Sequence, residues 1–331
     1  MLELLAPAGN LDAVIAAVQN GADAVYMGFG DGFNARRSAD NFTRESFAKA
    51  VRYCHIRGCK VYVTLNTLVG DREMDAAAAL AQQASDAGAD AILVQDLGLA
   101  RVLRAALPDI PLHASTQMSI HNLAGVEAAA EMGITRAVLA RELSLEQIRF
   151  ISQHASIETE VFVHGALCFC HSGQCYMSAL IGRRSGNRGA CAQLCRLPYD
   201  VSTEDGTVLA QRSHILSLKD NDQRANLEAL IDAGVSSFKI EGRLKDVQYV
   251  KNITALYRKE IDAILARRPE LCRSSAGETT FRFTPDAAKT FRRGATDYFV
   301  HGRDFSKPYE LAQTESPKNT GDPVARVLRI D

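Results

Sequence analysis

The sequence predicts an α/β protein whose core is a (β/α)₈ barrel of the TIM type, and two observations predict it. One pattern recurs along the chain: a helix that ends in a small residue and a glycine, followed by a short apolar strand. It occurs at residues 20–26, 87–94, 132–139 and 233–240. The glycine suits the left-handed position that ends a helix, and the strand suits burial on both faces. Repeated units of this kind produce parallel strands joined by crossover helices.

The second observation is the number of strands. Eight are expected, at residues 2–5, 24–28, 60–65, 91–95, 112–115, 137–140, 160–163 and 237–240. Amphipathic stretches between them predict helices, most clearly at residues 11–20, 44–57 and 75–87. Eight strands in about 240 residues match the usual size of such a barrel. A doubly wound open sheet is the alternative, less favoured because no Gly-rich phosphate-binding turn follows the first strand.

A long insertion interrupts the barrel. More than 70 residues separate the seventh and eighth strands, far more than an ordinary connection. We expect this insertion, residues 165–235, to leave the C-terminal end of a strand, where barrels carry their active sites. A helix expected at residues 247–267 completes a core of residues 1–267. Residues 268–331 are more polar and end in a strand-like run at 323–330, so we expect a C-terminal extension that begins a further domain.

Composition narrows the class of protein. The chain has 331 residues, of which 47% are hydrophobic and 23% charged, with a formal net charge of −1. That excludes a disordered chain, and no apolar run approaches the ~20 residues that span a bilayer. The first nine residues lack the basic region of a secretory signal, so we expect a cytoplasmic protein without a membrane partner. Near-neutral charge gives no general reason to expect nucleic acid, although a local basic patch would be compatible with it.

The cysteines cluster strongly. Five of the eight fall within 28 consecutive residues: Cys168, Cys170, Cys175, Cys191 and Cys195. In a reducing compartment, clustered thiols bind metal or carry out redox chemistry more often than they form disulfides. The other three, Cys54, Cys59 and Cys272, are scattered, and each is expected to be a small buried hydrophobic residue.

The cysteine spacing leaves the metal open. Cys168 and Cys175 are separated by six residues, and Cys191 and Cys195 by three. Thiolates select zinc, iron–sulfur clusters or copper(I). Structural zinc usually uses paired short knuckles, whereas a 4Fe-4S cluster accepts irregular spacing. Iron–sulfur is therefore preferred over zinc, and zinc over packing alone. His164 and His171 flank the cysteines and leave mixed ligation open.

Arginines accompany the cysteines. Between residues 165 and 199 there is no Asp or Glu, but there are four arginines: Arg183, Arg184, Arg188 and Arg196. Two interpretations have equal weight. The arginines stabilise an anionic thiolate-ligated centre as counter-charges, or they contact phosphate, which the planar guanidinium group binds well.

Charged residues also follow two of the expected strands. Lys239, Glu241 and Arg243 end the eighth strand, and alternation directs Lys239 and Glu241 to the same side, towards the barrel mouth. Arg141 and Glu142 end the sixth strand. Each group could act in catalysis or form a structural ion pair, and the sequence alone does not distinguish these two interpretations.

Other motifs carry less weight. His113, in the fifth strand, is expected to be a structural histidine with its hydrogen bonds satisfied. The Gly-rich residues 28–32 resemble a dinucleotide-binding turn, but no helix begins directly after them. The sequence contains neither His-Glu-x-x-His nor Gly-x-Ser-x-Gly, so no familiar hydrolase machinery is visible.

The cysteine region resembles the signature of the collagenase-like peptidase family U-32. The matching segments there are residues 163–168, 172–175 and 189–196, and further matches lie at 3–9, 21–26, 141–144 and 239–243. The resemblance covers residues 2 to about 267. It implies a barrel core and, as in several members, a 4Fe-4S cluster held by Cys168, Cys175, Cys191 and Cys195. Cys170 departs from some members and is a conceivable substitute ligand.

The resemblance also implies activities. The family is named for proteolysis, but its catalytic type was never assigned. Bacterial relatives hydroxylate without using molecular oxygen in the usual way: one branch forms 5-hydroxyuridine in transfer RNA with prephenate as a participant, another forms 5-hydroxycytidine in 23S ribosomal RNA, and a third works in ubiquinone synthesis. Residues 315–321 resemble the junction to a further C-terminal domain in the ribosomal-RNA branch.

These observations favour an iron–sulfur-dependent RNA hydroxylase whose insertion closes over the barrel mouth. In this hypothesis the four arginines hold phosphate, and prephenate is a conceivable co-substrate. The catalytic candidates are Lys239, Glu241, Arg243, Arg141 and His164. Two alternatives remain: a peptidase acting on collagen-like chains, and a non-catalytic binding module in which zinc only stabilises the fold of the insertion.

Overall fold

A computed structural model describes residues 1–30, 32–35, 41–303 and 310–312. Its centre is a closed barrel of eight parallel strands: β1 (Glu3–Pro7), β2 (Ala24–Met27), β3 (Lys60–Leu65), β4 (Ala91–Val94), β5 (Leu112–Ala114), β6 (Ile134–Val138), β7 (Glu158–Gly165) and β11 (Ser237–Ile240). The strands follow one another around the barrel in chain order, and β11 closes it by pairing with both β1 and β7. The predicted TIM-barrel-like fold is confirmed.

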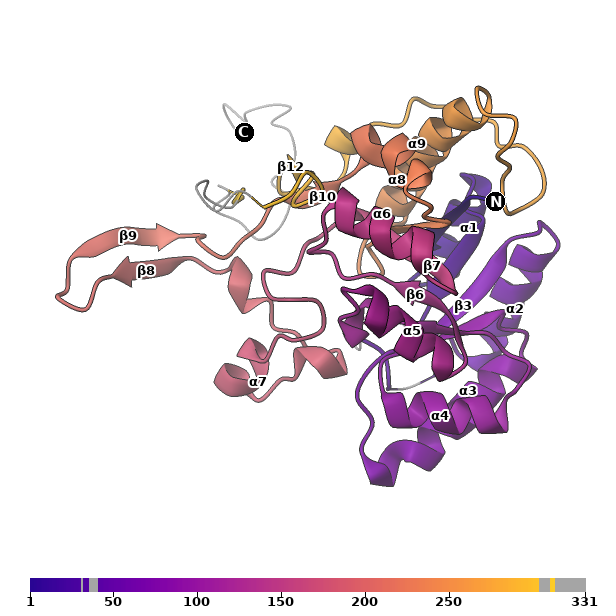
Figure 1. The fold of residues 1–331 in the computed structure, drawn as a ribbon, viewed down its shortest axis with the longest axis horizontal. Helices are drawn as coiled ribbons and strands as arrows, with labels where there is room; N and C mark the ends of the chain where they lie inside the picture. Colours follow the sequence, from indigo (N-terminus) through magenta and orange to yellow (C-terminus); the bar gives the residue numbers. More distant parts are fainter. Residues whose placement is uncertain (31, 36–40, 304–309, 313–331) are drawn as a thin grey trace, which may run out of the picture.

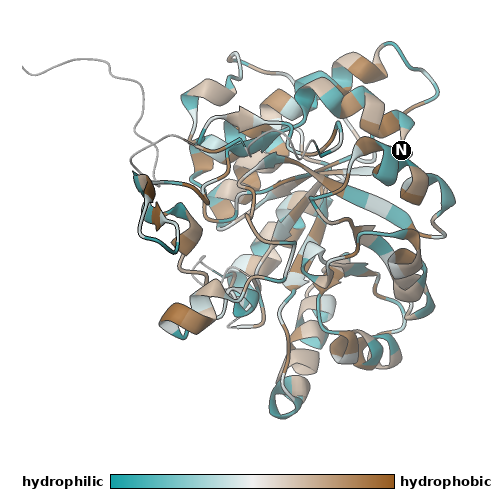
Figure 2. Ribbon diagram, turned by 60° about the vertical axis from the view of Figure 1, so that its left-hand side comes forward, coloured by the Kyte–Doolittle hydropathy of each residue, from teal (hydrophilic) through white to brown (hydrophobic). Residues whose placement is uncertain are grey.

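Helices surround the barrel (Figure 1). They are α1 (Leu11–Gln19), α2 (Arg44–His55), α3 (Met74–Asp86), α4 (Leu97–Ala106), α5 (Leu123–Glu131), α6 (Leu145–His154), α8 (Leu227–Asp232) and α9 (Val247–Leu265). Capping side chains explain where many of them begin. Asn10, Thr43 and Ser144, for example, each accept a hydrogen bond from a backbone N–H in the first turn of their helix. Figure 2 shows the helices banded in brown and teal, as expected of amphipathic helices.

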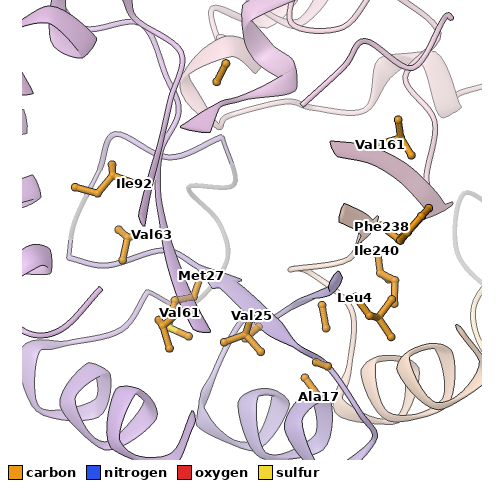
Figure 3. Close-up of a cluster of buried hydrophobic side chains, with 14 of the residues drawn as sticks. Leu4, Ala17, Val25, Met27, Val61, Val63, Ile92, Val161, Phe238 and Ile240 are labelled. Carbon is orange, nitrogen blue, oxygen red and sulfur yellow. The ribbon is translucent and has the colours of Figure 1, made fainter. Parts of the chain in front are cut away.

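Strand alternation divides the core in two. Outward-facing residues such as Leu4, Val25 and Val61 pack against the helices (Figure 3). The neighbouring inward-facing residues form a small apolar cluster inside the barrel: Leu5, Ala24, Tyr26, Tyr62, Ala91 and Leu93. The main core therefore lies between strands and helices, and a separate one fills the barrel.

A buried charge network shares the barrel interior. Arg136 forms ion pairs with Glu3, with Glu158 at 2.7 Å and with Glu160 at 3.4 Å. Burial alone would raise the pKa of Glu160, but nearby Lys239 and Arg136 hold that pKa below its usual value. Glu160 is thus ionised and paired inside the barrel.

Strand boundaries were predicted to within a few residues except at β6. The strand was expected at residues 137–140 but occupies Ile134–Val138. Leu139 and Ala140 are buried as well, so the apolar run continues past the part paired in the sheet. The strand-like run at 323–330 and the segment 315–321 lie outside the described residues.

The insertion leaves the C-terminal end of β7, as predicted. It contains α7 (Met177–Gly182), a hairpin of β8 (Tyr199–Ser202) and β9 (Val208–Ser213), and β10 (Asp220–Asp222), which pairs antiparallel with β7. The hairpin projects away from the barrel (Figure 1), and β12 (Ala295–Thr296) pairs with β10. The last part of the expected insertion is α8, which contacts α6 and belongs to the ring of helices.

No helix in the described ranges combines the length and apolarity needed to cross a bilayer.

Candidate functional site at the barrel mouth

A cavity of about 430 Å³ opens at the C-terminal ends of the barrel strands. It is lined by residues from nearly every strand end: Tyr26, Ala35, Thr64, Asn66, Leu93, Ser115, Thr116, Gln117, Arg141, Phe162, Lys239, Glu241 and Arg243. Four of these are sequence-predicted candidates, namely Arg141, Lys239, Glu241 and Arg243. This is the face at which TIM barrels carry their active sites.

Lys239 lies at the inner end of this cavity and is 3% exposed. Its Nζ donates to Glu160 Oε1 at 2.8 Å and lies 4.7 Å from the centre of the Tyr26 ring and 5.3 Å from that of Phe162. A cation over aromatic faces is favourable. Lys239 is therefore anchored in the barrel by a structural ion pair and also lines the cavity, and its catalytic role stays a prediction.

Arg141 and Glu241 form the rim on the β6 and β11 side. Arg141 Nη2 lies 3.4 Å from Glu241 Oε2, and Nη1 donates to the Ala166 carbonyl at 2.9 Å. The guanidinium carbon lies 4.1 Å from the centre of the Phe162 ring. Arg141 Nε is buried and has no hydrogen-bond partner within the described ranges. The pair joins the barrel rim to the first residues of the insertion.

Arg243 is buried on the opposite side of the cavity. Its Nη1 donates to Thr64 Oγ1 at 2.7 Å and its Nη2 to Asn34 Oδ1 at 2.8 Å. A Cβ at Gly28 would lie 2.2 Å from Asn41 Oδ1 and 3.1 Å from Arg243 Nη1. The first glycine of the Gly-rich segment 28–32 thus makes room for this packing, and Asp31 lies outside the described residues.

His164 is the candidate that the structure removes from the site. Its Nδ1 lies 3.3 Å from Tyr257 Oη, its ring packs edge-on against that of Tyr257 in α9, and burial lowers its pKa to about 4. The β7–β11 register shifts between Lys239, which pairs with Phe162, and Ile240, which pairs with His164. This bulge reverses the alternation, so that Phe162 lines the cavity while His164 faces α9. Its expected roles as a catalytic group and as a metal ligand are corrected.

His113 lies inside the barrel, as a structural histidine should, but its hydrogen bonds are not all satisfied. Its ring packs edge-on against Tyr62, with the centres 4.9 Å apart, and its Nδ1 has no partner in the described part of the chain. Burial and the nearby cations Arg136 and Lys239 hold its pKa well below the usual value. His113 is therefore neutral near pH 7.

The insertion brings the clustered cysteines together as free thiols. An interaction with Cys175 and burial raise the pKa of Cys168, and the same interaction lowers the pKa of Cys175 to about 7. Burial raises the pKa of Cys195, with smaller contributions from Arg196, Cys168 and Cys191. These influences place the four thiols in one neighbourhood of the insertion.

Thiols are the type of donor that iron–sulfur clusters use. Among the described residues, no three His, Cys, Asp or Glu side chains are close enough to share a single metal ion. The four thiolates of a 4Fe-4S cluster bind different irons, so their sulfurs surround a volume and do not converge on one point. Positive charge lies nearby, since Arg141 acts to lower the pKa of Cys168 and Arg196 that of Cys195.

The remaining cysteines and His171 differ in position. The Cys170 thiol donates to the Gln174 carbonyl at 3.3 Å and interacts with Cys168 and Cys175, so it lies near them. His171 is exposed. Cys54 and Cys59 are buried as predicted, but Cys272 is exposed, so its expected burial is wrong.

The four arginines are not equivalent. Arg196 is buried and donates to the carbonyls of Leu167 and Leu218, which suits a counter-charge and not a phosphate contact. Arg188 is exposed but forms a two-point ion pair with Glu73. Arg183 and Arg184 are exposed at the end of α7. The phosphate interpretation therefore suits these last two best.

Three contacts dock the insertion around the cavity rim. Glu142 accepts hydrogen bonds from the Ser172 backbone at 2.7 Å and hydroxyl at 3.1 Å. Gly173 packs so closely that a Cβ there would lie 2.2 Å from the Gln117 carbonyl oxygen. Arg188 reaches Glu73 on the β3 side at 2.6 Å. The contacts lie after β3, β5 and β6, so the cysteine segment spans part of the mouth.

Sequence reasoning missed the uncharged lining of the cavity. Polar residues that directly follow two apolar strands supply much of this lining. They are Asn66 after β3, and Ser115, Thr116 and Gln117 after β5. Asn66 Nδ2 donates to Ser115 Oγ at 3.1 Å, which joins the two sets of residues. Their signal was a polar residue directly after an apolar strand, which a search for charged residues passes over.

Comparisons with known proteins show what the chain is similar to. A model of Peptidase family U32 matches residues 9–308. The chain is 48% identical over 329 residues to the 23S rRNA 5-hydroxycytidine C2501 synthase of Escherichia coli, covering 99% of this chain and 49% of the synthase. It is 39% identical over 270 residues to tRNA hydroxylation protein P1 of Bacillus subtilis, covering 80% and 64%. It is 34% identical over 316 residues to Collagenase of Porphyromonas gingivalis, covering 91% of this chain and 74% of that protein.

The chain spans about half the length of the first of these relatives and less than two thirds of the length of the second.

Proposed function

The chain belongs to peptidase family U32, and from this premise we propose that it is the core of an enzyme that hydroxylates a pyrimidine in RNA. The observation that carries the proposal is the 48% identity, over nearly the whole chain, with a protein named as an rRNA 5-hydroxycytidine synthase. The similarity to a tRNA hydroxylation protein adds a second RNA class. The product is 5-hydroxycytidine in 23S rRNA or 5-hydroxyuridine in tRNA.

In this proposal Cys168, Cys175, Cys191 and Cys195 hold a 4Fe-4S cluster, with Cys170 as a substitute ligand. The neighbourhood that these four thiols share in the insertion supports that ligand set. The acid-free stretch between residues 165 and 199 supports it too, because carboxylates there would repel an anionic centre. When bound, such a cluster supplies electron transfer.

The cavity residues then bind the substrate and handle protons. Lys239 and Arg141 present cationic groups beside the Phe162 ring, an arrangement suited to a flat base with a polar edge. Among the described residues that line the cavity, Glu241 is the one with a carboxylate, so it is our candidate for moving a proton. Arg243, bonded to Thr64 and Asn34, orients the opposite wall.

We include prephenate as the co-substrate. It is a dicarboxylate, and among the described residues that line the cavity Arg141, Lys239 and Arg243 carry positive charge against the one carboxylate of Glu241. This excess of positive charge supports an anionic organic acid at the mouth.

RNA is the proposed partner, and Arg183 and Arg184 are its proposed phosphate contacts. Both are exposed on the segment that docks over the mouth. An accessible loop nucleotide suits the site better than a paired one, because a base inside a duplex cannot enter a cavity. Ribosomal and transfer RNA are cytoplasmic, so the proposed location is the cytoplasm.

Mass spectrometry of RNA tests the activity. Nucleosides from separated rRNA and tRNA of a strain lacking this gene are compared with those of the parent strain. We expect 5-hydroxycytidine or 5-hydroxyuridine to disappear from one RNA class and to return when the gene is restored. Unchanged content of both nucleosides in both classes would refute the proposal.

Metal analysis tests the cluster. Protein purified anaerobically is analysed for iron, sulfide and zinc, and its visible absorption is recorded. Iron and sulfide in a brown protein are expected. Stoichiometric zinc in a colourless protein, even under anaerobic conditions, would favour the zinc-stapled binding module in place of a redox enzyme.

A peptidase is the second candidate, favoured by the 34% identity with Collagenase of Porphyromonas gingivalis. It predicts that anaerobically purified protein cleaves gelatin and that removal of the metal abolishes cleavage. Intact gelatin after prolonged incubation with metal-loaded protein would count against it.

A further inference from the structure

The helix α7 of the insertion has one buried side and one exposed side. Ser178 anchors the buried side: it is 2% exposed, and its Oγ accepts a hydrogen bond from the Ala192 N–H at 3.1 Å and lies 4.0 Å from the Cys191 sulfur. On the exposed side, Leu180 is 84% and Ile181 66% accessible to solvent. Figure 1 shows α7 apart from the helices that surround the barrel, which agrees with this exposure.

An exposed tyrosine begins this side of the helix. Tyr176 directly precedes α7 and is 54% exposed, and no hydrogen bond, ring contact or ion pair of its side chain occurs among the described residues. Positions four and seven residues apart lie on the same side of a helix, so Leu180 and then Arg183, which directly follows α7, continue the line from Tyr176. An aromatic ring, an aliphatic side chain and a cation therefore form a stripe about 10 Å long, at a rise of ~1.5 Å per residue.

The charge of the segment favours RNA over protein as the occupant of this stripe. An exposed apolar surface often marks a protein contact. Here, however, residues 165–199 contain no Asp or Glu, and Arg183 and Arg184 are exposed at one end of the stripe. Proteins hold single-stranded RNA with this combination, since cations follow the phosphates while aromatic rings stack on the bases.

The stripe lies beside the barrel mouth. Gly173, three residues before Tyr176, packs against the backbone of Gln117, which lines the mouth cavity. Three residues of chain span about 11 Å at most. After α7 the segment returns to the rim at Arg188, which donates to the Leu68 carbonyl at 3.0 Å. A nucleotide on Tyr176 is thus close to the one whose base enters the mouth.

We propose that the exposed side of α7 docks an unpaired stretch of RNA and that Tyr176 stacks on a base near the target pyrimidine, an inference that rests on the proposed function. Leu180 extends the apolar contact, and Arg183 pairs with a phosphate of the same strand. Stacking tolerates every base, so this surface holds the strand without reading its sequence. It selects an unpaired strand, because a base inside a duplex offers no free face to the ring.

The experiment measures binding of a fluorescein-labelled single-stranded RNA of about ten nucleotides to the full chain, purified anaerobically, by fluorescence anisotropy. Tyr176→Ala is expected to weaken binding roughly 5- to 150-fold, the contribution of one stacked base. Tyr176→Phe keeps the ring and should stay within about twofold of wild type. The slope of log K against log salt should not change in Tyr176→Ala, since the ring neutralises no phosphate. Binding of the same sequence as a duplex should not depend on Tyr176.

Phe150 provides a matched control. It is 55% exposed on α6, outside the insertion, so Phe150→Ala removes an equally exposed ring and should leave the RNA affinity unchanged. A second readout uses the absence of tryptophan from the sequence. Tyr176→Trp and Phe150→Trp each introduce a single indole, and RNA is expected to quench the emission of the first variant alone. This readout does not depend on how the alanine variant folds.

The possible outcomes separate the inference from the proposed function. Wild-type affinity of Tyr176→Ala with unquenched emission of Tyr176→Trp overturns the docking surface and leaves the exposed side of α7 to a protein partner. Equal weakening in Phe150→Ala or in Tyr176→Phe also overturns it, because neither position nor ring would then matter. If the predicted effects of Tyr176 occur but loss of the gene changes neither nucleoside, the RNA surface stands and the hydroxylase proposal fails.

Discussion

Lys239 and Glu160 form an ion pair inside the barrel, with Nζ 2.8 Å from Oε1 and side chains that are 4% and 0% exposed. Glu160 also lies 3.4 Å from Arg136, so one carboxylate faces two cations. Lys239 lines the mouth cavity as well. The charge that stabilises the interior therefore also fixes the position of an amine at the candidate site.

Glu160→Gln is expected to destabilise the fold strongly. The substitution keeps the shape of the side chain but leaves Lys239 and Arg136 with less compensating charge. Removing one partner of a buried ion pair costs about 3–5 kcal/mol. Urea unfolding followed by circular dichroism measures the loss. The matched control is Glu45→Gln, which breaks the exposed 2.7 Å pair with Lys49 and should leave the unfolding midpoint unchanged.

His164 is expected to make the fold less stable as the medium is acidified. Burial lowers its folded pKa to about 4, against 6.5 as the ordinary value, so folding favours the neutral imidazole. The free energy of unfolding therefore includes a contribution from the neutral imidazole of up to about 3 kcal/mol. This contribution is complete above pH 6.5 and is lost as the pH falls towards 4. The stability difference between wild type and His164→Asn, measured by urea unfolding from pH 7.5 to 4.5, should shrink over this window. A constant difference would contradict the assignment.

The same histidine shows where prediction from the sequence stopped. The barrel and its strands were predictable because the glycine after each helix and the apolar strand that follows are local patterns. The orientation of His164 was not, because it depends on the register shift where β7 meets β11. A bulge of one residue moves every later side chain to the other face, and it is set by pairing between strands more than 70 residues apart.

The site was predictable in part for a similar reason. Cys168 and Arg141 were recognised because clustered thiols and charges at strand ends stand out from their surroundings. The burial of Arg196 was not predictable, because one of its acceptors is the carbonyl of Leu218, a bridge residue much further along the insertion.

Serine substitution is expected to distinguish ligands from neighbours among the cysteines. Cys168→Ser, Cys175→Ser, Cys191→Ser and Cys195→Ser should each lose most of the iron and sulfide of anaerobically purified protein, because an alcohol is a poor ligand for iron–sulfur clusters. Cys170→Ser tests the substitute ligand and should retain iron. Cys272→Ser, an exposed position far along the chain, is the control. Equal iron in all six variants would refute the ligand set.

Glu73→Gln is expected to loosen the insertion without unfolding the barrel. Glu73 accepts two hydrogen bonds from Arg188, and the interaction with Arg188 is the main reason that the pKa of Glu73 falls to about 2. Hydrogen exchange should therefore rise in the segment around Arg188 while the helices of the barrel stay protected. The control is Asp86→Asn, which alters an exposed bond to Gln82 on α3. Unchanged exchange around Arg188 would show that the other docking contacts suffice.

Arg183 and Arg184 are expected to contribute to RNA affinity through charge. Both are exposed on the segment that covers part of the mouth, and no acidic residue lies between 165 and 199 to neutralise them. Replacing both by alanine should weaken binding of a single-stranded RNA and reduce the slope of log K against log salt by about 0.7 for each phosphate that is no longer neutralised. Arg101 and Arg149, exposed on α4 and α6, provide a double-alanine control of equal charge change. Fluorescence anisotropy over a series of salt concentrations measures both slopes. If the control lowers the slope as much as the test variant does, the effect comes from net charge and Arg183 and Arg184 do not bind phosphate specifically.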